Sequence, residues 1–68
     1  MTWEELKEKA KEMGDKCHAE DIIHLYKQEL DITVYKYGTV SIRDGYGNDV
    51  CIGNRTPEQM LMIMKGLE

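Results

Sequence analysis

Residues 19–30, with the sequence AEDIIHLYKQEL, decide the fold of this 68-residue chain because they can be interpreted in two ways. As a helix, the stretch gathers four apolar side chains on one face: Ile22, Ile23, Tyr26 and Leu30. As a strand, it has the β-branched and aromatic residues typical of sheets, followed by a turn at residues 27–29. We favour the strand, because it pairs at once with the next segment and a hairpin of two strands is only marginally stable. The helix remains the alternative for residues 20–28.

Downstream of this stretch the pattern is typical of an antiparallel meander. Residues 32–35 and 39–42 alternate in polarity and are rich in β-branched and aromatic side chains, so both are predicted strands. Residues 36–38 form a tight hairpin between them. The glycine-rich segment 44–49 is a second turn, and residues 50–52 form a short further strand.

Two helices flank these strands, and both have clear start signals. Thr2 and Glu5 have the T-x-x-E spacing of a capping box, and Gly14 marks the end of the first helix. Thr56 precedes Pro57 at the first helical position of the second helix, which is predicted to run to about residue 67.

The resulting order is α-β-β-β-(β)-α, a single α+β domain over residues 1–68. We expect a two-layer sandwich in which an antiparallel sheet lays one face on both helices. The sheet contributes six core residues: Ile32, Val34, Val40, Ile42, Val50 and Ile52. The helices contribute eight: Trp3, Leu6, Ala10, Met13, Met60, Ile63, Met64 and Leu67.

Composition excludes several functional classes. Nine basic and thirteen acidic residues give a net charge of −4, which disfavours nucleic acids and anionic membranes as partners. No apolar run is long enough to span a bilayer. The first five residues, MTWEE, have no apolar segment typical of a secretory signal, so we expect a cytoplasmic protein whose two cysteines are reduced thiols.

The sequence contains no constellation typical of catalysis, of a cofactor or of a metal. Cys17, His18, His24 and Cys51 do not have the close pairs of ligands usual in structural zinc sites. The glycines near Tyr46 open no helix and therefore do not form a phosphate loop. We expect no enzyme activity, no cofactor and no bound metal.

The element order is similar to the double-stranded-RNA-binding fold and to small ribonuclease toxins of the HicA type. Those toxins carry an active-site histidine on an early strand, usually after a glycine, in a strongly basic protein. His24 has the matching place in the order, but no glycine precedes it and this chain is acidic. The resemblance implies an RNA-binding or ribonuclease-like domain as the alternative function.

Surplus apolar and aromatic residues point to a protein partner. Residues 60–64, MLMIM, are more apolar than one core-facing stripe requires. Leu61 falls at the edge of that stripe, and Met62 projects to the opposite side. Tyr35 lies on the sheet face opposite Ile32, where an amphipathic aromatic side chain suits an interface. We therefore assign Leu61, Met62 and Tyr35 as candidate partner-binding residues.

The two ends of the chain, TWEELKEKAKEMG and NRTPEQMLMIMKGL, resemble small uncharacterised proteins of phages and mobile elements in Gram-positive bacteria. The resemblance covers about 40% of the chain and transfers no functional residue. It implies a cytoplasmic accessory protein that binds and modulates another protein. The predicted function is therefore a non-enzymatic protein-binding module, with another protein or a second copy of the chain as its partner.

Overall fold

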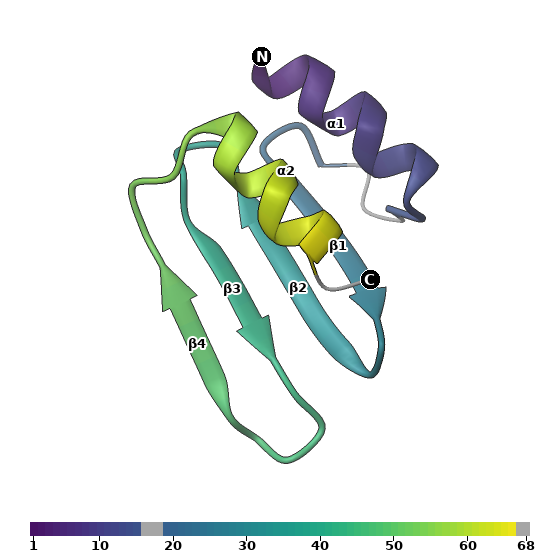
Figure 1. The fold of residues 1–68 in the computed structure, drawn as a ribbon, viewed down its shortest axis with the longest axis vertical. Helices are drawn as coiled ribbons and strands as arrows, with labels where there is room; N and C mark the ends of the chain where they lie inside the picture. Colours follow the sequence, from purple (N-terminus) through teal and green to yellow (C-terminus); the bar gives the residue numbers. More distant parts are fainter. Residues whose placement is uncertain (16–18, 67–68) are drawn as a thin grey trace.

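The computed structural model describes residues 1–15 and 19–66, which form two helices and a four-stranded antiparallel sheet (Figure 1). The elements follow one another as α1 (Trp3–Glu12), β1 (Ile22–Lys27), β2 (Leu30–Tyr35), β3 (Val40–Arg43), β4 (Asp49–Ile52) and α2 (Pro57–Gly66). The strands lie side by side in chain order, β1-β2-β3-β4. This arrangement confirms the predicted α+β fold, and the short fourth strand belongs to the sheet.

The ambiguous segment is a strand, as predicted. β1 pairs with β2 in a register that places Ile23 opposite Val34 and Lys27 opposite Leu30. Gln28 and Glu29 alone connect the two strands, and both have positive φ angles, of 51° and 66°. Such left-handed pairs match the twist of a two-residue hairpin, although Asn and Gly adopt them with less strain.

Both helices start where their caps predict. The Thr2 hydroxyl accepts the Glu5 backbone N–H at 3.2 Å, at the start of α1. At α2 the bonds are reciprocal, because Thr56 Oγ1 accepts the Gln59 N–H at 3.2 Å and Gln59 Oε1 accepts the Thr56 N–H at 2.9 Å. These bonds satisfy N–H groups that have no partner within a helix.

The core lies between the helices and one face of the sheet. Ten apolar side chains are buried there: Trp3, Leu6, Ala10, Ile23, Leu25, Ile32, Val34, Val40, Met60 and Met64. Three of the other predicted core residues, Met13, Ile42 and Ile63, are half-buried against this cluster. Leu67 lies outside the described residues.

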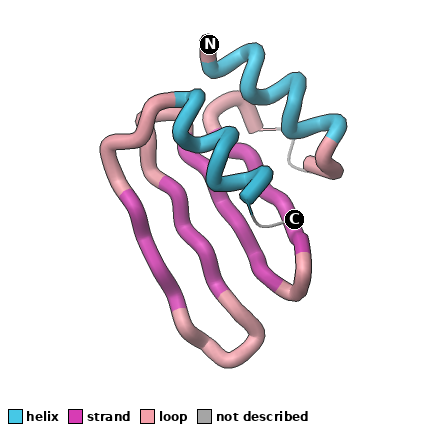
Figure 2. The backbone as a smooth tube through the Cα atoms, in the orientation of Figure 1, coloured by secondary structure: helices cyan, strands magenta, loops and turns pink. Residues whose placement is uncertain are grey.

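The helices cover only part of the sheet. They lie toward β1 and β2, whereas β4 and the far end of β3 extend beyond them (Figures 1 and 2). Val50 was predicted to be a core residue, and this prediction is wrong: its side chain is 55% exposed. It does lie on the helix-side face, opposite Ile42, but β4 extends beyond both helices (Figure 1).

No helix among the described residues is long and apolar enough to cross a membrane.

Candidate protein-binding surface

An apolar surface remains open on the helix side of β3 and β4. Val50 pairs with Ile42, and Ile52 pairs with Val40, so all four side chains lie on the face that the helices partly cover. Val40 is fully buried, whereas Ile42 and Ile52 are half-buried and Val50 is exposed. We call Ile42, Val50 and Ile52 the open sheet surface. Val50 is its exposed member, and contiguous apolar area that reaches solvent marks contact sites for other molecules.

The open sheet surface ends at β4, whose outer side carries unpaired backbone groups. The Asp44 N–H donates to the Asn48 carbonyl at 3.1 Å, which makes these two residues a hydrogen-bonded pair. Hydrogen-bonded and non-bonded pairs alternate along antiparallel strands. The backbone groups of Asp49 and Cys51 therefore point away from β3. No bond from residues 1–15 or 19–66 reaches the outward groups of Cys51.

At the opposite edge of the sheet, a side chain covers one outward backbone group. On β1 the same alternation turns the His24 N–H outward, and the Asp15 carboxylate accepts it at 3.0 Å. Just before β1, the Glu20 carbonyl accepts a hydrogen bond from Trp3 Nε1 at 2.8 Å, which links this part of the chain to α1. β4 has no comparable cover in the described part of the chain, and its four residues include neither Lys nor Pro, which commonly block edge pairing.

The structure separates the three predicted partner-binding residues. Met62 is 72% exposed on the outer side of α2. Leu61 is half-buried and packs against the core, so most of its apolar surface is already covered. Tyr35 lies on the face of the sheet away from the helices and stacks on Tyr37, with ring centroids 5.7 Å apart. These residues do not form one surface.

The outer sheet face carries a second group of polar side chains. His24 Nε2 contacts the Asp31 carboxylate across β1 and β2, and both side chains are about half exposed. On the other half of the sheet, Asp49 accepts a bond from the Ser41 hydroxyl at 3.2 Å and lies 3.6 Å from the Arg43 guanidinium. These four charged or titratable side chains, His24, Asp31, Arg43 and Asp49, therefore have partners in their own sheet.

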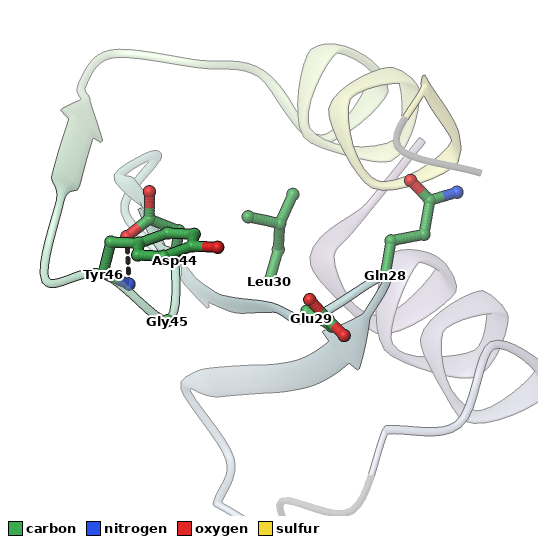
Figure 3. A pocket seen from close by; sticks show the side chains of 6 residues that line it. All are labelled: Gln28, Glu29, Leu30, Asp44, Gly45 and Tyr46. Atoms are coloured by element: carbon green, nitrogen blue, oxygen red, sulfur yellow. Dashed lines mark hydrogen bonds between the residues drawn. The ribbon is translucent and has the colours of Figure 1, made fainter.

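A cavity of about 430 Å³ lies between the two hairpin turns at one end of the sheet. Leu30 lies between the Gln28–Glu29 turn and the turn that contains Asp44 and Tyr46 (Figure 3). The Asp44 carboxylate accepts backbone N–H groups of Tyr46 and Asn48, both at 2.9 Å, and the Asn48 side-chain amide at 3.0 Å. This carboxylate thus stabilises its own turn, and that role accounts for its position.

The same bonds predict a pH dependence. Hydrogen bonds from Asn48, above all from its side-chain amide, lower the pKa of Asp44 in the folded chain. A carboxyl with a lowered folded pKa stabilises the fold above its unfolded pKa, and this contribution is lost as the pH falls through the folded pKa. We expect Asp44→Asn to lose less stability than the wild type between about pH 5 and pH 2.

The measurement is the urea midpoint of unfolding at a series of pH values, followed by the fluorescence of Trp3. Glu8→Gln on α1 is the control, because that exposed carboxylate forms an ion pair with the exposed Lys11 and accepts no hydrogen bond from a turn in the described structure. Parallel pH profiles for the wild type and Asp44→Asn would contradict the role assigned to the turn.

Metal-binding residues do not gather in the part of the chain that the structure describes: no three His, Cys, Asp or Glu side chains are placed to share an ion. Cys17 and His18, which were weighed as zinc ligands, lie outside the described residues. Cys51 carries an exposed free thiol on the outer face of β4.

The free edge and the open sheet surface were missed by sequence reasoning. Alternation along residues 50–52 assigns Val50 and Ile52 to the helix-side face, and the structure agrees. The available signal was the length of the helices: two of ten residues each span only about 15 Å and do not cover four strands.

Comparison of the chain with protein-family models, with curated proteins and with solved structures gives no match.

Proposed function

We propose that this protein is a non-enzymatic protein-binding module that pairs an extended segment of its partner with β4. The observation that carries the proposal is the outer side of β4, where no described residue bonds to the backbone groups of Cys51, beside the exposed Val50. An extended chain added there gains backbone hydrogen bonds from the edge, and its alternate side chains meet the apolar face. Specificity would come from side chains that fit Val50 and Ile52.

The three residues that the sequence predicts to bind a partner lie outside this binding surface. Met62 and Tyr35 lie on other surfaces, and Leu61 is held in the core cluster. The binding surface is therefore moved from α2 to the β4 side of the sheet. The resemblance of the two chain ends to small phage and mobile-element proteins supports a cytoplasmic accessory role for this module.

The test is a selection of peptides from a display library, followed by mapping of the bound site from amide NMR shifts. We expect extended peptides with alternating apolar residues, and we expect the largest shifts at Asp49, Cys51 and Gly53. Cys51→Pro removes an outward N–H that makes no bond within the sheet, so the fold is retained while binding is lost. Met62→Glu is the matched control and leaves binding unchanged.

Two results would contradict this proposal. One is selected peptides that shift the α2 amides or the outer sheet face instead of β4. The other is unchanged peptide binding by a folded Cys51→Pro variant.

One observation favours a second candidate function, an RNA-binding or ribonuclease-like domain. His24 is half exposed beside the Asp31 carboxylate, an arrangement that orients an imidazole for proton transfer. This candidate predicts cleavage of RNA at low salt and its loss in His24→Ala. Absence of both binding and cleavage at low salt would remove it.

A further inference from the structure

We propose that the partner of β4 is a second copy of this chain, and that two β4 strands pair antiparallel about a two-fold axis at Cys51. This inference rests on the proposed function, because it uses the same free edge and names what occupies it. Three features of the edge match a second copy in this orientation: its backbone groups, its apolar side chains and its charges.

The backbone groups are self-complementary. In an antiparallel pair about Cys51, the outward N–H and C=O of this residue meet those of its symmetry mate. Two residues to either side, Asp49 meets Gly53 of the other copy, the residue that directly follows β4. The outward groups of Asp49 and Cys51 are then used at once, and the Gly53 carbonyl, which already accepts the Arg55 Nε–H of its own copy, serves as a shared acceptor. Pairing about Val50 instead uses fewer of them, because Gly53 is then left beyond the contact.

The apolar side chains also match. With Cys51 on the axis, Val50 lies directly opposite Ile52 of the other copy, on the helix-side face. Cβ atoms of such cross-strand neighbours are about 4.5–5.5 Å apart, close enough for direct packing. A two-fold axis perpendicular to the sheet keeps the helices of both copies on one side. The two open sheet surfaces then join into one apolar floor between the two α2 helices.

The charges of the edge are opposite at its two ends. Asp49 stands at one end, and at the other the Arg55 Nε donates to the Gly53 carbonyl at 3.1 Å. Because Asp49 pairs with Gly53 of the other copy, each carboxylate comes to lie beside the other copy's guanidinium. The two Asp49 carboxylates stay about 14 Å apart, since four residues of strand separate them. Each copy carries a net charge of −4, and this arrangement keeps acids away from the axis.

The contact is small, because β4 has only four residues. Interfaces at the low end of the size range form weak, reversible complexes. We therefore expect monomer at low micromolar and dimer at high micromolar to millimolar concentration, measured by sedimentation. Cys51→Lys places two ammonium groups at the axis and abolishes the dimer, whereas Cys51→Ser retains it. Met62→Glu on α2 leaves it unchanged.

Cross-linking tests the register. Residues in a hydrogen-bonded antiparallel pair have Cα atoms about 5.5 Å apart, which suits a disulfide. In a Cys17→Ser background, mild oxidation should link Cys51 to its symmetry mate. Asp49→Cys combined with Cys51→Ser keeps one exposed thiol on the same strand but separates the two sulfurs. We expect this control to form its disulfide at least about tenfold more slowly.

A charge exchange tests the orientation. Asp49→Lys and Arg55→Glu should each weaken the dimer, and the double variant should recover most of the lost affinity, because lysine and glutamate then face each other across the axis. Equal cross-linking of the two cysteine positions, or no recovery in the double variant, would overturn the antiparallel arrangement about Cys51.

The oligomeric state separates this inference from the proposed function. A wild-type chain that stays monomeric at millimolar concentration overturns the second copy as partner, while peptide binding at β4 would still support the protein-binding module. A dimer that Met62→Glu dissociates and Cys51→Lys does not would place the contact on α2 and overturn the inference.

Discussion

Gly38→Ala is expected to lower the free energy of unfolding by about 3 kcal/mol, because it combines backbone strain with a steric clash. Gly38 is buried in the turn between β2 and β3, with a φ angle of 104° that L-residues rarely adopt. A Cβ atom there would lie 2.7 Å from the Arg55 carbonyl oxygen. The clash is with backbone, so no side-chain rotation relieves it.

The loss is large for this domain. At about 0.05–0.15 kcal/mol per residue, a chain of 68 residues has a total stability of roughly 3–10 kcal/mol. The close approach at Gly38 also positions α2, because the Arg55 N–H donates to the Gly38 carbonyl at 2.9 Å just before the helix begins. Urea unfolding followed by Trp3 fluorescence measures the effect, since Trp3 is the one tryptophan and is buried.

Alanine substitutions at two other glycines distinguish the cost of backbone strain from the cost of the steric clash. Gly47 also has a positive φ, of 88°, but a Cβ there meets nothing within 4 Å, so Gly47→Ala should cost only about 1 kcal/mol. Gly45 has open space and no positive φ, and Gly45→Ala should lie within about 0.5 kcal/mol of the wild type. If Gly38→Ala and Gly47→Ala were equally stable, the contact between the turn and Arg55 would not be as described.

Met64→Ala is the second substitution with a large expected effect, a loss of about 2–4 kcal/mol. The Met64 side chain is fully buried between α2 and the sheet, so its truncation removes apolar burial and leaves a cavity. The helix itself is not weakened, because alanine has the highest helix propensity. The denaturant midpoint should therefore fall at an unchanged slope.

Met62→Ala is the matched control on the same helix. Its side chain is 72% exposed, so the truncation should change stability by less than about 0.5 kcal/mol. A similar loss in both variants would mean that α2 is rotated about its axis relative to the structure. Oligomerisation through α2 would appear differently, as a loss in Met62→Ala that grows with protein concentration.

Much of the architecture follows from local patterns that act within a few residues. The caps at Thr2 and Thr56 fall where their side chains can bond to the next turn of the helix. Gly38 sits in its hairpin as predicted. β1 was the harder segment, because Ile22, Ile23, Tyr26 and Leu30 fit a helical face, whereas Ile23 and Leu25 fit a strand face. Its pairing with β2 selects the strand over the helix. Such pairing depends on two segments together, so the pattern of one segment alone does not reveal it.

The candidate site could be predicted only in part, and Val50 shows why. Alternation predicts correctly which side of the sheet a residue faces, because successive side chains of a strand point to opposite sides. It carries no information on how far a helix reaches across that side. In the same way, the run at residues 60–64 predicts the buried stripe of α2, but it does not reveal whether Met62 meets anything.

The sequence of 68 residues thus predicts the order of the elements, where they end and which side chains face inward. Each of these features depends on neighbours one turn or one strand away. The difference between the β1 edge and the β4 edge is not predicted in this way. On β1 the Asp15 carboxylate accepts the outward His24 N–H, whereas no described residue bonds to the outward groups of Cys51 on β4. This difference depends on where the two short helices pack on a sheet that is wider than they are. Packing between distant segments, not local sequence, therefore places the binding surface at β4.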